Sequence, residues 1–337
     1  MRTLRFLLRR AGWSLAVVFL VTTATFFLNR AIPADPARMV AGPQARPADV
    51  TRIRQQLGLD RSIAVQYSIF LRRLVHLGPS TFVPEKTPDH STCGHFGPFH
   101  FDLGRSYQQQ RSVVAILKKR LPYTAVLAVA ATLISLVLGV GSGVIAAIRR
   151  NTWIDSTTVG LSLLGISAPT FLLGVLLQYL FAYQLGVLPL NGSGEGLIDG
   201  AAHLALPALT LGIFGAALYT RMVRGEMIEL MKQDYIRTAR AKGLSPARVV
   251  IVHGLRNALV PIVTVVGLDF GALLGGAVIT EQIFSWPGVG SLAVRAMRDR
   301  DGPVIIGTVL VGALVIVVAS LLVDVAYAML DPRIREE

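Results

Sequence analysis

Hydrophobic residues along this chain are gathered into six long runs, separated by segments that hold most of the charge. The runs cover residues 11–28, 121–148, 159–183, 204–223, 259–283 and 304–330. A helix of about 20 apolar residues spans the hydrocarbon core of a membrane, so each run is long enough to cross it. Pro169 and Pro207 interrupt the third and fourth runs, and a proline kinks a spanning helix. The pattern predicts an all-α polytopic membrane protein with six transmembrane helices.

The first run has a competing interpretation as a cleaved signal peptide, because four arginines precede it. A signal peptide usually has an apolar core of about 7–15 residues that ends at a small-x-small cleavage site. This run is longer and continues into Asn29-Arg30-Ala31-Ile32-Pro33, which is a poor cleavage site. We therefore expect residues 1–30 to form a cytoplasmic tail and an uncleaved first span.

Composition agrees with a membrane protein and sets its orientation. Charged residues make up 16% of the chain, against about 25% in soluble domains. The net charge of +13 does not indicate a nucleic-acid partner, because basic residues collect in the cytoplasmic connections of membrane proteins. Arg149-Arg150 and the segment 224–258 are basic, whereas the connection 186–203 has no Lys or Arg. Both termini are therefore predicted to face the cytoplasm, with the lipid bilayer as the surroundings of the spans.

A long polar segment, residues 31–120, follows the first span and is predicted to lie outside the cytoplasm, ahead of a five-helix core at 121–337. Within it, residues 79–100 are rich in Pro and Gly and have the character of an insertion. His90, Cys93, His95 and His100 are residue types that bind zinc, but their spacing fits no standard zinc module. We expect an exposed loop without metal. Cys93 is the only cysteine, so no internal disulfide can form.

The most densely charged segment lies between the fourth and fifth runs, at 224–258. Gaps of three and four residues predict a helix with one apolar face, formed by Ile228, Met231, Tyr235 and Ala239, and with Glu226 and Glu229 in its first turns. Gly243 can end that helix with a positive φ, and Ser245-Pro246 can begin a second short helix. A loop that only sets membrane orientation remains the alternative. Such a loop needs no apolar face, hinge glycine or caps, so these features favour a surface that docks another protein.

Two motifs in this segment carry a family resemblance. YIRTARAKGLS (235–245) and HGLRNALVP (253–261) resemble the cytoplasmic coupling loop of binding-protein-dependent ABC importer permeases, in particular the first permease of dipeptide and oligopeptide importers. Ala239, Gly243 and Leu255 match the wider permease pattern. The pattern's Glu, first Ala, Ile and Pro are replaced here by Arg237, Thr238, His253 and Arg256. Further resemblance lies in residues 55–74, 101–107, 281–292, 298–307 and 321–335.

The resemblance implies a type I ABC importer permease in a bacterial plasma membrane. Members of the family import dipeptides, oligopeptides, nickel or glutathione, together with a second permease, two ATPase subunits and an external substrate-binding protein. The resemblance of segment 235–255 implies a contact with the ATPases, for which the candidate residues are Tyr235, Arg237, Thr238, Ala239, Arg240, Gly243 and Leu255. Because Arg237 replaces the Glu of the pattern, any contact made by that Glu is not carried over.

The chain offers little chemistry of its own. No stretch matches GxxxxGK[ST], so an ATP site is expected on another chain, and neither an enzymatic activity nor a cofactor is predicted. Asp269 lies in the middle of the fifth run, where an ionised group is costly and usually faces protein or water. It is a candidate for lining the transport path, or a structural partner of a Ser, Thr or Tyr on a neighbouring helix. The alternative function is a secondary transporter that couples to protons through Asp269.

Overall fold

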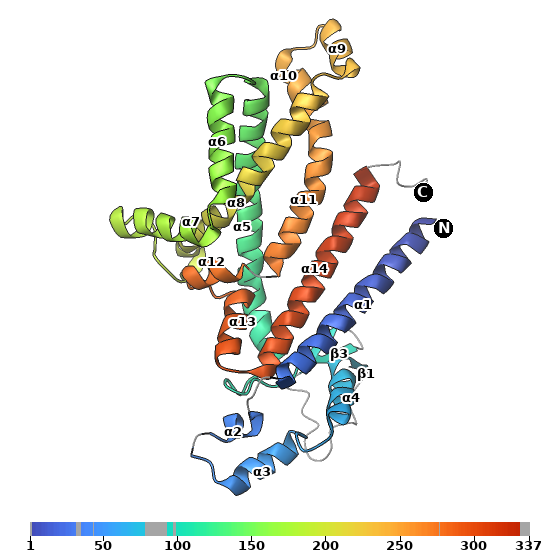
Figure 1. Cartoon of the computed structure of the whole chain (residues 1–337), viewed down its shortest axis with the longest axis vertical. Coiled ribbons are helices and arrows are strands. Elements are labelled where there is room, and N and C mark those ends of the chain that lie inside the picture. Colours follow the sequence, from blue (N-terminus) through green and yellow to red (C-terminus); the bar gives the residue numbers. More distant parts are fainter. Residues whose placement is uncertain are drawn as a thin grey trace. The chain divides into compact units, whose positions relative to one another are not determined.

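The computed structural model describes residues 2–31, 35–42, 44–77, 93–96, 99–275 and 277–330, and Figure 1 labels its helices and strands. The chain forms two compact units. Unit 1 holds residues 1–10, 123–287 and 315–337, and unit 2 holds residues 11–122 and 288–314. Three long helices contribute to both units: α1 (Arg2–Ala31), α5 (Val113–Ile148) and α14 (Gly302–Leu330).

Within the described residues, four helices are long and apolar enough to cross a membrane, or up to six spans if two bent helix pairs each count as one. The four are Gly12–Arg30, Val113–Ile148, Gly196–Leu230 and Gly302–Leu321. They confirm the first, second, fourth and sixth predicted spans. Pro207 lies inside the fourth without dividing it.

The third predicted span is not one kinked helix. It consists of Trp153–Ser167 and Thr170–Gln184, which meet at 104°. Ala168 and Pro169 between them have extended backbones. For Ala168 the reason is that a residue that precedes proline avoids the helical region. The fifth predicted span also changes: α11 (Arg256–Leu274) ends early, and the remaining apolar residues form the separate helix α12 (Val278–Ile283).

Unit 1 contains the helices between residues 123 and 287. They are α6 (Trp153–Ser167), α7 (Thr170–Leu177), the π-helical segment η2 (Gln178–Gln184), α8 (Gly196–Leu230), α9 (Asp234–Ala241), α10 (Pro246–Arg248), the π-helical segment η3 (Val249–Leu255), α11 and α12. Some of its buried polar groups are bonded across helices: Thr124 of α5 donates to the fully buried Glu281 of α12 at 2.9 Å. The Trp286 indole donates to the backbone oxygen of Tyr123 at 2.9 Å.

Helices α5 and α8 approach each other closely because small residues line both sides. A Cβ atom built on Gly139 or Gly143 of α5 would lie 2.7 Å from the Cβ of Tyr219 or Val223 on α8. Ser142 and Thr220 hydroxyls are 2.6 Å apart at the same contact. Small residues allow such close approach of helix backbones in membranes. These glycines of α5 were not singled out from the sequence.

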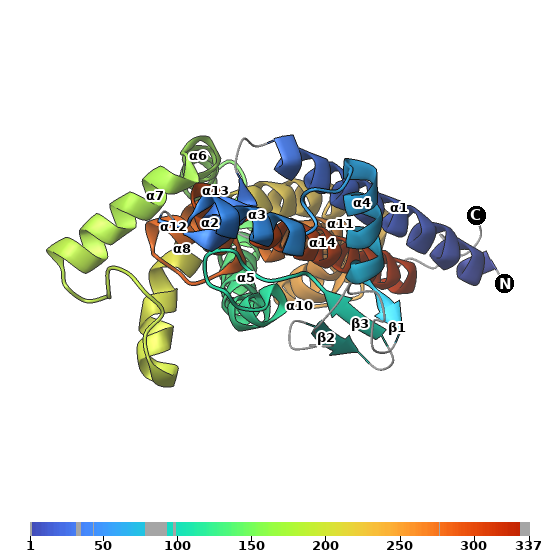
Figure 2. The ribbon, with the colours of Figure 1, turned by 90° about the horizontal axis from the view of Figure 1, so that it is seen from below.

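Unit 2 contains α2 (Pro36–Ala41), α3 (Pro47–Gln56), α4 (Ile63–Leu74), α13 (Val289–Arg298) and three short strands. The strands β1 (His76–Leu77), β2 (Cys93–Phe96) and β3 (Phe99–Asp102) pair in the antiparallel order β1-β3-β2, and Figure 2 shows them beside α4. The predicted exposed loop at 79–100 is therefore wrong where β2 and β3 form. Alternating residues in Cys93–Phe96 were too few to distinguish a strand from a loop. Among the described residues, no group of His, Cys, Asp or Glu could hold a metal ion.

The close α5–α8 contact yields a stability prediction. Gly143→Ala adds a methyl group that must displace Val223 or the Thr220 carbonyl oxygen, and overpacking of this kind costs about 1–3 kcal/mol. Gly141, two residues away, has no neighbouring atom within 4 Å of such a methyl, so Gly141→Ala is the matched control. We expect the thermal unfolding midpoint in detergent to fall for Gly143→Ala and to be unchanged or slightly raised for Gly141→Ala. Equal midpoints for the two variants would contradict close packing.

Candidate functional site

The charged segment between α8 and α11 is not one continuous helix at its start. Helix α8 ends at Leu230, and α9 begins at Asp234 after an extended Gln233. Glu226 and Glu229 therefore lie in the last turns of α8, not in the first turns of a new helix. The hydrophobic spacing continues across the break, so it could not reveal where one helix stops.

The apolar face of α9 differs from the prediction at one position: Ala239 is buried as predicted, but Ile236 is buried in place of Tyr235. Ile236 and Ala239 are the buried residues of α9, and they pack with Val249 of η3. Tyr235 is instead 40% exposed. Its hydroxyl accepts a hydrogen bond from the Asn257 amide at 3.2 Å, and the same amide donates to the His253 backbone oxygen at 3.0 Å. Tyr235 therefore connects α9 to the start of α11 from the surface.

Gly243 ends α9 in the predicted conformation, with φ of 76°. Its N–H donates to the Arg240 oxygen at 2.9 Å, and the Leu244 N–H donates to the Ala239 oxygen at 3.4 Å. These two bonds form a Schellman motif, in which a left-handed residue satisfies the last carbonyls of a helix. Leu244 packs in the same small cluster as Ala239, which fixes the direction of the chain after the turn.

The second helix begins as predicted but is not short. Ser245 occupies the N-cap position and Pro246 the first turn of α10, without a side-chain capping bond from Ser245. The helix then continues through η3 into α11. Gly254 of η3 is buried against α8: a Cβ there would lie 3.0 Å from the terminal carbon of Met227. Leu255 packs into the neighbouring cluster around Met227 and Ala258. The segment 235–255 is thus held against the end of α8.

The outer face of α9 is cationic. Arg237 is 77% exposed at its side chain and faces only a weak partner, Asp234, at 3.5 Å. Thr238 is exposed and donates to the Asp234 backbone oxygen at 3.0 Å. Arg240 borders a hollow of about 420 Å³. The other residues that line the hollow are Ala147, Ile148, Met227, Met231, Leu244, Pro246, Val249 and Val250.

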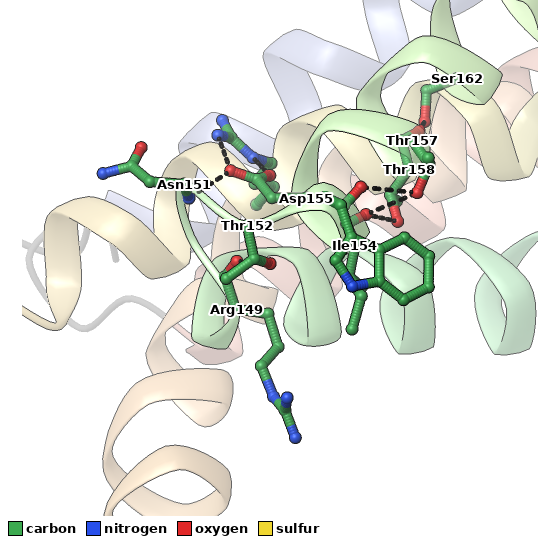
Figure 3. Close-up of polar contacts among 10 residues, drawn as sticks. Arg149, Asn151, Thr152, Ile154, Asp155, Thr157, Thr158 and Ser162 are labelled. Atoms are coloured by element: carbon green, nitrogen blue, oxygen red, sulfur yellow. Dashed lines mark hydrogen bonds and ion pairs between the residues drawn. The ribbon is translucent and has the colours of Figure 1, made fainter.

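An ion pair missed by the sequence analysis connects the turn between α5 and α6 to α8 (Figure 3). Arg224 donates from Nε to Asp155 Oδ1 at 2.5 Å and from Nη2 to Oδ2 at 2.8 Å. The Asn151 N–H donates to the same Oδ2 at 3.0 Å, and Asn151 has φ of 62°. Asp155 is 4% exposed, so its charge is paired and bonded where burial alone would be costly. The sequence offered two signals for this ion pair: Asp155 lies in the first turn of α6, and Arg224 lies near the basic end of a span.

Asp269 has a partner on a neighbouring helix. The Tyr219 hydroxyl of α8 donates to Asp269 Oδ2 of α11 at 2.9 Å, in a half-buried position. This is the tyrosine partner that the sequence analysis gave as one alternative. A role of Asp269 in the transport path stays a prediction.

The bent spans, the closely packed helices and the helix–glycine–helix segment define an integral membrane transport subunit. Two parts of one family match: the binding-protein-dependent transport system inner membrane component over residues 139–336, and the N-terminal part of that membrane component over residues 3–128. The chain belongs to this family of ABC importer permeases and is a multi-pass protein of the bacterial inner membrane.

Individual relatives agree with this assignment. A putative peptide transport system permease protein of Brucella abortus (strain 2308) is 40% identical over 98% of both chains. The glutathione transport system permease protein GsiC of Escherichia coli (strain K12) is 36% identical over 98% of this chain and 99% of that protein. A chain of the inward-facing MetNI methionine ABC transporter superimposes with a TM-score of 0.54 at 18% identity, covering 65% of this chain and 98% of that chain. The fold is that of a type I importer permease, and a proton-coupled secondary transporter is not favoured.

The Asp155–Arg224 pair gives a prediction for stability. Asp155→Ala leaves Arg224, whose side chain is 27% exposed, without its carboxylate. Losing one partner of a fully buried pair costs about 3–5 kcal/mol, and partial exposure reduces the expected loss to about 2 kcal/mol. The control is Asp49→Ala, which removes an exposed pair with Arg52 and should change stability by less than about 0.5 kcal/mol. Thermal unfolding in detergent measures both, and equal shifts would contradict a structural role for the pair.

Proposed function

We propose that this permease imports peptides and forms half of a translocation pathway with a second, homologous permease. The relatives named as peptide and glutathione permeases support the substrate class, since they align over nearly the whole chain. The family works with an ATPase and a substrate-binding protein. We infer two ATPase subunits, one on each permease, and an external binding protein that delivers the peptide. ATP binding belongs to those subunits, because this sequence contains no GxxxxGK[ST] stretch.

The observation that carries the coupling role is the construction of segment 235–255. Buried Ile236 and Ala239, the Gly243 turn and the contact of Gly254 with Met227 hold α9 firmly to the end of α8. Its outer face meanwhile remains exposed and cationic. A rigid element with a free charged face transmits the movement of a docked partner, whereas a flexible loop would absorb it. We assign this face to the ATPase contact.

Individual residues have distinct roles in this proposal. Arg237 and Arg240 are three positions apart, so they are neighbours on the helix surface and suit acidic groups of the ATPase. Tyr235 and Thr238 flank them as exposed polar contacts. Ala239, Gly243 and Leu255 act inside the element, as packing and turn residues that keep it rigid.

The turn at Gly243 provides the first functional test. Gly243→Val places a β-branched residue at φ of 76°, at a strain of about 1–3 kcal/mol, although no atom lies within 4 Å of the added Cβ. Gly243→Asn is the matched control, because Asn tolerates this conformation. We expect Gly243→Val to abolish peptide uptake in a strain lacking the native gene while the protein still reaches the membrane, and Gly243→Asn to retain most of it.

Charge reversal tests the docking face in the same experiment. Arg237→Glu with Arg240→Glu should abolish uptake and co-purification of the ATPase, because reversing charges at a partly buried contact can cost a few kcal/mol. Arg111→Glu, an exposed change elsewhere in the chain, is the control and should leave both unchanged. If the double reversal also leaves uptake and co-purification normal, segment 224–258 only sets orientation and the coupling role is wrong.

Asp269 is proposed to line the transport path or contact its gate. Asp269→Asn keeps the size of the side chain and removes its charge, and we expect reduced uptake with normal complex assembly. Tyr219→Phe separates the two roles, because it removes the interhelical bond and keeps the carboxylate. A path-lining role predicts a larger loss of uptake for Asp269→Asn than for Tyr219→Phe at every pH tested. Full uptake by Asp269→Asn would leave only the structural role.

A further inference from the structure

Unit 2 contains a pocket of about 230 Å³ that is lined neither by Asp269 nor by segment 235–255. It lies among the end of α1, α4, the end of β3 and the start of α14. The polar residues that line it are Asn29, Arg30, Gln66, Arg73, Asp102 and Tyr107. The apolar part of the lining includes Phe26 and Phe70, whose rings stack at 5.1 Å.

The pocket has an excess of positive charge. Asp102 is the only acid among the described residues that line it, and its carboxylate is already occupied: Arg73 donates to Oδ2 at 2.9 Å and the Gly104 N–H to Oδ1 at 2.8 Å. Arg30 forms no ion pair with any residue that the structure describes. Its guanidinium carbon lies 5.7 Å from the centre of the Phe26 ring, which holds the side chain at the pocket. Two arginines and one carboxylate leave a net charge of +1.

Tyr107 adds a neutral hydrogen-bond donor to the same lining. Its hydroxyl makes no hydrogen bond within the described part of the chain, although the residue is half-buried. Burial raises the pKa of Tyr107, the charge of Arg30 acts against this rise, and the charge of Asp301 adds to it, while Arg73 acts against it less strongly than Arg30. The two arginines and Tyr107 line the same pocket, and together they offer hydrogen-bond donors to an anion.

The pocket lies where two membrane spans of unit 2 end. The α1 span finishes at Arg30 and the α14 span begins at Gly302, and Arg30 and Pro303 both line the pocket. With both termini cytoplasmic, these are the outer ends of the spans. Phospholipid phosphates lie at this level, just beyond the hydrocarbon core. Phe27 and Leu28 next to the pocket are 46% and 68% exposed, which suits contact with an acyl chain.

We propose that this pocket binds the phosphate of an anionic phospholipid from the outer leaflet of the membrane. Arg30 donates the charge-assisted hydrogen bond to the phosphate, and Tyr107 donates a second one. Arg73 presents the N–H groups that do not bond Asp102, so it can contact the phosphate while Asp102 stays paired. Arginine suits this task because its planar fork matches phosphate geometry. The bound headgroup would hold α1 and α14 at a common depth. This site is independent of the coupling role proposed for segment 235–255.

The test measures lipid binding to the purified permease complex by native mass spectrometry, with dioctanoyl phosphatidylglycerol as the probe. Two further probes are compared with it: dioctanoylglycerol, which lacks the phosphate, and glycerol 3-phosphate, which lacks the acyl chains. The test variant is Arg30→Gln with Tyr107→Phe, because neither side chain makes a hydrogen bond or ion pair with another described residue, and the backbone hydrogen bonds of Tyr107 are kept. Arg73 is left intact, since its loss would leave the buried Asp102 unpaired. Arg52→Gln, whose side chain is 71% exposed outside the pocket, is the matched control.

We expect the double variant to bind phosphatidylglycerol about tenfold more weakly than the unmodified complex and the Arg52→Gln control, because a charge-assisted bond is lost. Unfolding temperatures without lipid should be the same for all three proteins. Equal phosphatidylglycerol affinity in all three would overturn the proposal. Binding of dioctanoylglycerol with the same affinity would show that only acyl chains are recognised, which also overturns it. Binding of glycerol 3-phosphate as strong as that of the lipid would assign the pocket to a soluble anion and refute the membrane source.

Discussion

Unit 1 depends on the close contact between α5 and α8. Gly139 and Gly143 let the two backbones approach until a single added methyl group would collide with Tyr219 or Val223. In a bilayer, no hydrophobic force draws helices together, so close van der Waals packing and interhelical hydrogen bonds must do so. The Ser142–Thr220 bond lies in the same contact. This packing fixes the position of α8 relative to α5.

Three contacts join α8 to other helices of unit 1. Tyr219 bonds Asp269 of α11, Arg224 bonds Asp155 of α6, and Met227 receives Gly254 of η3. These three contacts follow one another along α8 toward its end at Leu230. A movement imposed on segment 235–255 would therefore reach α11 and α6 through a helix that packing prevents from bending independently. In the proposed coupling role, these contacts would connect segment 235–255 to α6 and to α11, which carries Asp269.

Much of the architecture was predictable from local patterns. Runs of apolar residues located four spans within the described chain, because length and hydropathy alone decide whether a helix can cross a membrane. The Gly243 turn was also predictable, since few residues other than glycine adopt a positive φ at low cost. Motif similarity in 235–261 indicated the family that the comparisons confirm. The roles of individual residues within that segment remain predictions.

Other features depend on contacts between residues far apart in the sequence. Spacing of three and four residues continues through the break at Leu230, so the choice of Ile236 over Tyr235 as the buried side chain is made by Val249 packing against α9. The sequence shows Pro169, but a proline permits both a slight kink and the observed 104° turn, so the angle could not be predicted. The partners of Asp155 and Asp269 were hidden because any of several helices could have supplied them. Sequence alone thus determined which segments enter the membrane and which family the chain resembles, through hydropathy and short motifs. Only the tertiary structure decided which faces pack and which charges pair, because those depend on distances between helices that no local pattern contains.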